Sequence, residues 1–267
     1  MRNKLTSNKF SSTMTFFENE FISGLLSGAV YPVFQPIVNK HHKILGFEIL
    51  LRWNINGKEI SAGEFIDRIK STNSHAILAE FLIRTAIYNI SKYNGRLFFS
   101  VNITSINIIV TEILYNIILS MREKICRKEW MKKLNLEFAE HLDFYKDSRI
   151  AYFVKRLLDL NVTIDLDDCF SKKSVHFPTR DIKFTGYKLD KTITSNFIHD
   201  SYDSSLIRSL LYFCILTGST CTAEGIENYN TMFELCKLGV SRFQGYWISK
   251  PVPINELDNL IRLLGII

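Results

Sequence analysis

Acidic and amide side chains lie within or directly after several apolar runs of this 267-residue chain. The run GFEILLRW, residues 46–53, carries Glu48 in its middle and Arg52 four residues later. A charge in a dry core is costly unless it is paired, hydrogen-bonded or bound to a metal. Similar polar positions close other apolar runs: Asn102, Glu137, Asp167 with Asp168, Lys188, Glu224 and Gln244.

These residue types predict a site for hard cations. Carboxylates gathered in one place repel one another unless cations are present, and oxygen ligands without His or Cys favour Mg²⁺ or Mn²⁺ over Zn²⁺. Two such ions are the usual apparatus for in-line attack on a phosphodiester, where they activate water and stabilise charge on the phosphate. One polar strand end alone has a simpler interpretation as a loop boundary. Seven polar residues at corresponding positions of seven apolar runs favour a shared site.

Eight short runs rich in β-branched and aromatic residues predict the strands that position these side chains. Helical spacing lies between most of them, as in residues 75–93. Only the segment NKHH separates the first two strands, which is too short for a crossover helix and predicts an antiparallel pair. The predicted strands are 31–38, 43–50, 96–103, 133–138, 161–167, 186–190, 219–224 and 242–248.

Strands that alternate with helices imply parallel pairing through right-handed crossovers, and eight of them favour a closed barrel. The predicted fold is an α/β modified TIM (β/α)8 barrel with the first strand antiparallel to the others. The C-terminal strand ends of such a barrel form one rim, so the polar strand ends converge on a single mouth. The chain contains no linker or low-complexity tract. We expect one domain over residues 17–267 after an N-terminal extension, residues 1–16.

Strand alternation makes a further prediction within TIDLDD, residues 163–168. Adjacent strand residues point to opposite faces, so the strand must end between Asp167 and Asp168 if both serve the site. Asp165 lies on the face of Asp167, one layer deeper in the barrel, where an isolated carboxylate needs a proton or hydrogen-bond donors. We predict that Asp165 is buried and bonded at this depth, the alternative being a bulge that sends it to solvent. The candidate partners, in order, are Asn135, Arg242, and then Ser100 or Thr222.

Composition bounds the class of protein. The hydrophobic fraction is 46% and the charged fraction 22%, which is typical of a globular chain. No apolar run is long enough to cross a bilayer or to form a secretory signal. The five cysteines show no metal-ligand spacing, and they fit a reducing compartment. We expect a cytoplasmic protein with no membrane segment. The net charge of +6 is scattered, and its densest segment, residues 121–133, favours a solvated helix end over nucleic-acid contact.

Taken together, the runs resemble the motifs of the EAL-domain family, bacterial phosphodiesterases that linearise cyclic di-GMP. FEILLRW resembles the family signature, with Ile49 in place of its alanine, and the resemblance extends from about residue 17 to residue 264. Each motif is weak alone, but their order and spacing are specific. The other motifs are FQPIV (34–38), SVNIT (100–104), LEFAE (136–140), IDLDDCF (164–170), KLD (188–190), AEGIE (223–227) and QGYWISKP (244–251).

The resemblance implies a role for each matching residue. Two Mg²⁺ or Mn²⁺ ions would be held, with Asp167 bridging them, and Lys188 would position the catalytic water. Glu224 would act as general base or second-metal ligand, and Arg52 would bind a phosphate of the substrate. Gln244 would support the site's water, and Glu140 and Glu227 would brace the site. The other metal ligands would be Glu48, Asn102 and Glu137 for the first ion and Asp168 for the second.

Departures from the family pattern keep an alternative open. Ala139 replaces a threonine. Phe170 and Lys172 lie in a loop where the family has glycines, which adopt backbone conformations that other residues reach only at a cost. In the family this loop couples metal binding to dimerisation. The resemblance implies a homodimeric enzyme that hydrolyses cyclic di-GMP to linear pGpG, lowering a messenger of biofilm formation and motility. The alternative is a catalytically silent relative that acts as a nucleotide receptor or binds a transcription factor.

Overall fold

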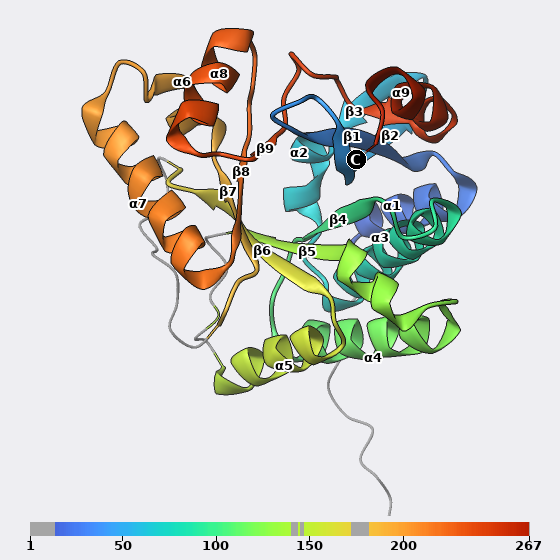
Figure 1. The fold of residues 1–267 in the computed structure, drawn as a ribbon. Coiled ribbons are helices and arrows are strands. Elements are labelled where there is room, and N and C mark those ends of the chain that lie inside the picture. Colours follow the sequence, from blue (N-terminus) through green and yellow to red (C-terminus); the bar gives the residue numbers. More distant parts are fainter. Residues whose placement is uncertain (1–13, 140–143, 145–146, 172–181, 267) are drawn as a thin grey trace, which may run out of the picture.

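The computed structural model describes residues 14–139, 144, 147–171 and 182–266. Its centre is a barrel in which the strands follow one another around the ring as β1, β2, β4, β5, β6, β7, β8 and β9, and β9 pairs back onto β1 (Figure 1). The barrel strands are β1 (Val30–Asn39), β2 (Ile44–Ile55), β4 (Phe98–Ile103), β5 (Leu134–Ala139), β6 (Thr163–Cys169), β7 (Gly186–Leu189), β8 (Thr220–Ala223) and β9 (Arg242–Phe243).

The direction of β1 confirms the predicted departure from a regular barrel. β1 runs antiparallel to β2 and to β9, whereas every pair from β2–β4 round to β8–β9 is parallel. A tight connection joins β1 to β2, and His42 within it takes a left-handed φ of 58°. The short NKHH segment therefore forms the hairpin that its length predicts.

Helices surround the barrel (Figure 1). Residues 75–93, predicted as a helix, lie almost wholly in α3, whose N-cap Ser71 accepts a hydrogen bond from the Ser74 backbone N–H. No helix among the described residues has the length and apolar character needed to span a membrane. The helices are α1 (Phe16–Ser27), α2 (Ala62–Phe65), α3 (Thr72–Lys92), α4 (Ile108–Lys124), α5 (Ser148–Asp159), α6 (Lys191–Asn196), α7 (Ser201–Thr217), α8 (Tyr229–Leu238) and α9 (Leu257–Leu264).

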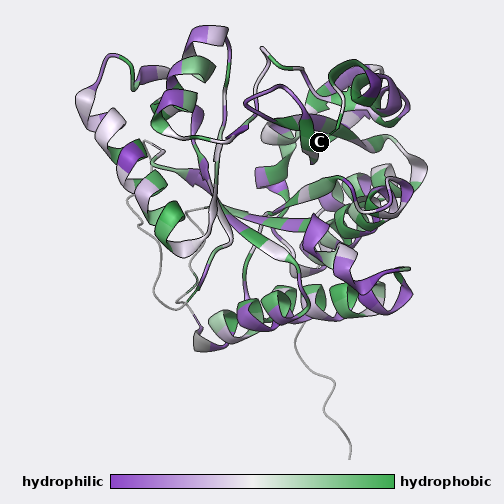
Figure 2. Ribbon diagram, in the orientation of Figure 1, coloured by the Kyte–Doolittle hydropathy of each residue, from purple (hydrophilic) through white to green (hydrophobic). Residues whose placement is uncertain are grey.

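Alternation along the strands separates two environments. Val101, Leu136 and Ile164 are fully buried on the outer face of the barrel, where the helices cover it. The intervening residues that point inward are polar, and Figure 2 shows the resulting alternation of hydrophobic and hydrophilic residues along the central strands. On these strands the barrel interior is therefore polar, and the layer between strands and helices is apolar.

Several strands differ from the predictions. β2 continues to Ile55 and turns into β3 (Lys58–Ser61), so Glu48 lies in the middle of a strand and not at its end. A further strand, β10 (Val252–Pro253), pairs with β1. β9 ends at Phe243 instead of residue 248, because the Gln244 carbonyl and the Trp247 N–H bond to the backbone of Ile226.

Candidate active site

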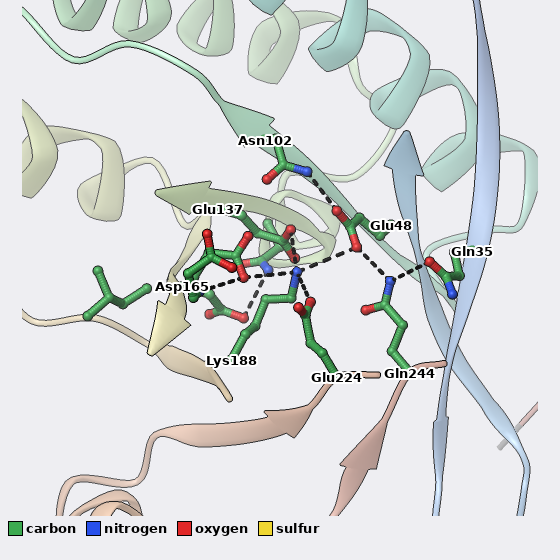
Figure 3. Close-up of polar contacts among 12 residues, drawn as sticks. Gln35, Glu48, Asn102, Glu137, Asp165, Lys188, Glu224 and Gln244 are labelled. Carbon is green, nitrogen blue, oxygen red and sulfur yellow. Dashed lines mark hydrogen bonds and ion pairs between the residues drawn. The ribbon is translucent and has the colours of Figure 1, made fainter. Parts of the chain in front are cut away.

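The Lys188 ammonium is the centre of an acidic cluster inside the barrel (Figure 3). Its Nζ lies 2.6 Å from Glu224 Oε1, 2.9 Å from Glu137 Oε2, 3.3 Å from Asp167 Oδ1 and 3.5 Å from Glu48 Oε2. These residues come from β2, β5, β6 and β7 and from the residue after β8. The structure thus brings together side chains that the sequence placed on five separate strands.

Amide side chains hold the Glu48 carboxylate in place. Asn102 Nδ2 donates to Glu48 Oε1 at 2.6 Å, and Gln244 Nε2 donates to Glu48 Oε2 at 2.6 Å. Gln244 Nε2 also lies 3.2 Å from Gln35 Oε1. The sequence interpretation assigned no role to Gln35, although a glutamine inside the apolar run FQPIV was a usable signal. Gln35 stands directly opposite Glu48 in the β1–β2 pair.

Both carboxylates of the Asp167–Asp168 pair reach the site, but by a different route from the one expected. β6 does not end between them; it continues to Cys169. Its pairing with β7 shifts between Leu166 and Cys169, and Asp168 takes a left-handed φ of 57° within this irregularity. A bulge cancels the usual alternation. Asp167, Asp168 and Glu224 consequently present carboxylate oxygens that lie within 4.8 Å of one another.

Burial and crowding shape the electrostatics of the cluster. Burial, together with repulsion from neighbouring carboxylates, raises the pKa of Glu137 well above its usual range and that of Glu224 to about 8, even though Lys188 opposes the shift. Burial also acts to raise the pKa of Glu48, but Lys188, Gln244 and Asn102 outweigh it and lower that pKa. Burial works against the Lys188 cation, yet the surrounding carboxylates raise its pKa well above normal.

One layer deeper, the prediction for Asp165 is confirmed. Asp165 is buried, with 4% of its surface exposed, and its Oδ2 accepts a hydrogen bond of 3.0 Å from Asn135 Nδ2, the first candidate. Thr185 Oγ1, which was not among the candidates, lies 3.3 Å from Asp165 Oδ1. Burial raises the pKa of Asp165, while Arg242 and the Asn135 bond oppose the rise.

A hollow of about 280 Å³ opens beside the acidic cluster. Glu48, Asp167, Glu224, Glu227 and Gln244 all contribute to its wall. Sequence reasoning missed two exposed residues that also line the hollow, Lys191 and Tyr246. Lys191 follows the KLD motif directly, and Tyr246 lies within QGYWISKP, so both lay in or beside a recognised motif without an assigned role.

Arg52 is not part of this wall. Arg52 lies further along β2 than Glu48, and its Nε is 3.7 Å from Glu59 Oε1 on β3. Its Nη1 donates to the Leu51 carbonyl at 2.8 Å. Glu140, predicted to brace the site, and Lys172 lie outside the described residues.

The donor set of the cluster fits hard cations. Carboxylates outnumber the one buried ammonium, and the raised pKa of Glu137 reflects burial and uncompensated negative charge. Glu137 Oε1 and Gln244 Oε1 are buried acceptors with no hydrogen-bond partner among the described residues. Free oxygen acceptors beside a surplus of carboxylates are the environment that Mg²⁺ and Mn²⁺ prefer.

Sequence comparison identifies relatives of this architecture. The EAL domain family model matches residues 19–251. A cyclic di-GMP phosphodiesterase of Pseudomonas aeruginosa is 25% identical over 237 residues, which cover 86% of this chain and 40% of that protein. The biofilm architecture maintenance protein MbaA of Vibrio cholerae is 25% identical over 243 residues, covering 88% of this chain and 30% of that protein. The chain thus spans less than half the length of both relatives.

Solved structures with the same fold agree. An EAL domain protein from Listeria monocytogenes superposes with a TM-score of 0.77 at 23% identity, covering 95% of this chain and all of that one. The phosphodiesterase PaMucR in complex with c-di-GMP also gives a TM-score of 0.77, at 19% identity, over 91% of this chain and all of that one. With the family match extending over most of its length, this chain belongs to the EAL domain family.

Proposed function

We propose that this protein is a metal-dependent phosphodiesterase that hydrolyses cyclic di-GMP to linear pGpG. The observation that carries the proposal is the convergence of Glu48, Glu137, Asp167 and Glu224 on one buried ammonium beside an open hollow. Related proteins named as cyclic di-GMP phosphodiesterases support the choice of substrate.

Two Mg²⁺ or Mn²⁺ ions are the proposed cofactors. Such ions supply Lewis acidity toward a phosphate and lower the pKa of water at neutral pH. Asp167 would bridge the pair of ions. The further ligands would be Glu48, Asn102 and Glu137 for one ion and Asp168 for the other.

The remaining residues of the cluster would move protons and orient water. Glu224, whose pKa is raised to about 8 by burial and by nearby carboxylates, is suited to accept a proton near neutral pH. Lys188 donates in several directions at once and is fixed by its ion pairs, so it would orient the attacking water. Gln244 would support that water, and Glu227 at the edge of the hollow would brace the site, as would Glu140.

Cations near the hollow would hold the two phosphates of the substrate. Lys191 is exposed and lines the hollow, so its charge would be available to a phosphate there. Arg52 would serve the same purpose after exchanging its long contact to Glu59, at 3.7 Å, for a phosphate. Tyr246, also in the wall, offers an aromatic face to a guanine base.

The rival function is a receptor that binds the nucleotide without cleaving it. One observation favours it: Phe170 holds a left-handed φ of 63° in the loop where the family has glycine. Silent relatives, however, typically lose metal ligands or the general base. All of those positions keep their residue types here, so hydrolysis is the preferred function.

The test compares metals in one assay. Purified protein is incubated with cyclic di-GMP and Mg²⁺, Mn²⁺ or Ca²⁺, and the products are separated by chromatography. We expect linear pGpG with Mg²⁺ and Mn²⁺, and uncleaved nucleotide with Ca²⁺, whose larger and looser coordination shell misplaces the attacking oxygen. A receptor would bind the nucleotide under every condition and cleave it under none.

We further propose a cytoplasmic homodimer whose phosphodiesterase domain covers residues 17–267, with residues 1–16 as an extension. The five cysteines are free, which fits a reducing compartment. Exposed apolar residues at the end of α7, namely Tyr212, Ile215 and Leu216, offer a surface for the second copy.

A further inference from the structure

A second polar pocket lies at the opposite end of the barrel from the acidic cluster. It encloses about 240 Å³ where the parallel strands begin: Phe98, Thr163 and Arg242 are the first residues of β4, β6 and β9. We call it the basal pocket and define it by six of its lining residues: Lys132, Lys133, Asn135, Thr163, Asp165 and Arg242. The proposed hydrolysis uses none of them.

The rim and wall of the basal pocket are cationic. Lys132 is exposed, and Lys133 and Arg242 are half-buried. Burial lowers the pKa of Lys133, and the positive charges of Lys132 and Arg242 add to the effect. Lys133 Nζ lies 3.5 Å from the Arg96 carbonyl, and the Arg242 guanidinium stands over the Phe98 ring at 5.2 Å. Among the described residues these three cations form no salt bridge, and the Asp165 charge attracts only Arg242 of the three, so together they create a favourable place for an anion.

The floor of the basal pocket presents acceptors instead. Asn135, with 3% of its surface exposed, donates a hydrogen bond from Nδ2 to Asp165 Oδ2, while its Oδ1 has no hydrogen-bond partner among the described residues. Space for Asp165 depends on Gly186, because a Cβ there would collide with Asp165 Oδ1 and Thr220 Oγ1. A buried acceptor without a donor is costly unless something supplies one.

We propose that the basal pocket binds a small molecule that carries both a phosphate group and hydroxyl groups, as a polyol phosphate does. The phosphate contacts Lys132, Lys133 and Arg242 at the rim and wall through charge-assisted hydrogen bonds. The hydroxyl groups donate to Asn135 Oδ1 and Asp165 on the floor. Because the cations lie near the opening and the acceptors lie on the floor, the ligand binds with its phosphate outward and its hydroxyl groups inward.

Isothermal titration calorimetry on the full chain, in the presence of a chelator, tests this with three probes. Glycerol 3-phosphate combines both groups, inorganic phosphate lacks the carbon-bound hydroxyls, and glycerol lacks the charge. We expect saturable binding of glycerol 3-phosphate and weaker binding of inorganic phosphate by about tenfold, because its hydrogen bonds to the floor are lost. Glycerol should show no measurable binding, because it lacks the charge that the cations attract.

Matched charge removals locate the site. Lys133→Met and Arg242→Met should each weaken glycerol 3-phosphate binding about tenfold, and Lys133→Met alone is decisive if the Arg242 variant does not fold. Lys128→Met is the control, because Lys128 belongs to the same basic segment but pairs with Glu123 and does not line the pocket. Lys191→Met controls for binding at the hollow beside the acidic cluster, which Lys191 lines.

Several outcomes would overturn the proposal. They are an absence of saturable binding, equal affinity for glycerol 3-phosphate and inorganic phosphate, and an equal loss in Lys128→Met, which would mean unspecific attraction to positive charge. If Lys191→Met loses binding while Lys133→Met keeps it, the phosphate binds at the hollow beside the acidic cluster.

Discussion

Lys188 is the residue on which the acidic cluster depends. Its side chain is 2% exposed and contacts four carboxylates, so its charge offsets part of their mutual repulsion. Removing one partner of a buried ion pair leaves an uncompensated charge and costs about 3–5 kcal/mol. The cluster is therefore a place where a cation stabilises the fold.

We predict that Lys188→Met lowers the free energy of unfolding by about 3–5 kcal/mol in chelator, and that Mn²⁺ restores more stability to this variant than it adds to wild type. Urea denaturation with and without Mn²⁺ measures both effects. Lys191→Met, an exposed cation at the same hollow, should change stability by less than about 0.5 kcal/mol. A Lys188→Met protein as stable as wild type in chelator would show that the carboxylates need no cation.

Glu224 allows a test of proton transfer. Glu224→Gln keeps the shape of the side chain but removes the base, so kcat should fall by about 100-fold or more, while the Kd for cyclic di-GMP changes by severalfold at most. Steady-state kinetics and calorimetry give the two values. Glu234→Gln, in an exposed pair with Lys237, is the control. Normal kcat with poor affinity would make Glu224 a binding residue and not a base.

Single-residue features of the site were predictable to different degrees. Alternation alone predicted that Asp165 is buried against Asn135, because period two holds as far as Asp167. The bulge at Asp168 was not predictable, because left-handed backbone at a non-glycine residue leaves no mark in the residue pattern. Gln35 was missed because its partner Gln244 is distant in sequence and meets it only when the barrel closes.

At the scale of elements, the strands were predicted better than their ends. The β2–β3 hairpin was missed, although Asn56-Gly57 is a strong two-residue turn signal and both residues take positive φ, 52° and 84°. The early end of β9 could not be predicted, because it depends on backbone bonds to Ile226 in another segment. Local signals thus start and turn strands, while distant partners decide where some of them stop.

The start of α1 is joined to the start of α3 by one carboxylate. Glu18 is 1% exposed and accepts hydrogen bonds from the backbone N–H groups of Thr15 at 2.8 Å, Lys70 at 2.9 Å and Ser71 at 2.6 Å. Burial alone would raise the pKa of Glu18, but these donors outweigh it and lower the pKa from 4.5 to about 2. The carboxylate therefore stabilises the folded state above pH 4.5, and this stabilisation is lost as the pH falls toward 2.

We predict that Glu18→Gln lowers the free energy of unfolding by about 1–3 kcal/mol at pH 7, and that the difference from wild type shrinks as the pH falls from 5 toward 3. Urea denaturation across this range provides the values. Glu20→Gln, on an exposed position of the same helix, is the control. A difference that stays constant with pH would exclude a charged Glu18 as the cause.

At the scale of the whole molecule, assembly can be tested through α7. Leu216 and Ile215 are 67% and 77% exposed near the end of this helix. We predict a mass of two chains by light scattering, and of one chain for Leu216→Glu. Leu26→Glu on α1, also highly exposed at 85%, should leave the dimer intact. A wild-type monomer, or dissociation by Leu26→Glu alone, would rule out assembly through α7.

The barrel as a whole was predictable because eight strands alternating with helices admit few other closed arrangements, and the NKHH hairpin fixed the direction of β1. Its polar interior was predictable only in part. Strand ends such as Glu137 and Glu224 indicated the acidic cluster, but the basal pocket needs residues from distant segments, including Lys133 and Arg242, to meet at the strand beginnings. Sequence periodicity places each residue on a face without showing how wide the barrel is there.

Hydrolysis itself is tested most directly by the turnover of cyclic di-GMP by the purified chain with Mn²⁺, measured beside Glu48→Ala. We predict that wild type forms linear pGpG, that a chelator stops the reaction, and that Glu48→Ala loses about 100-fold or more of kcat/KM while keeping its circular dichroism spectrum. A folded wild-type chain that binds Mn²⁺ and the nucleotide but leaves the ring uncleaved would contradict hydrolysis and make the protein a receptor.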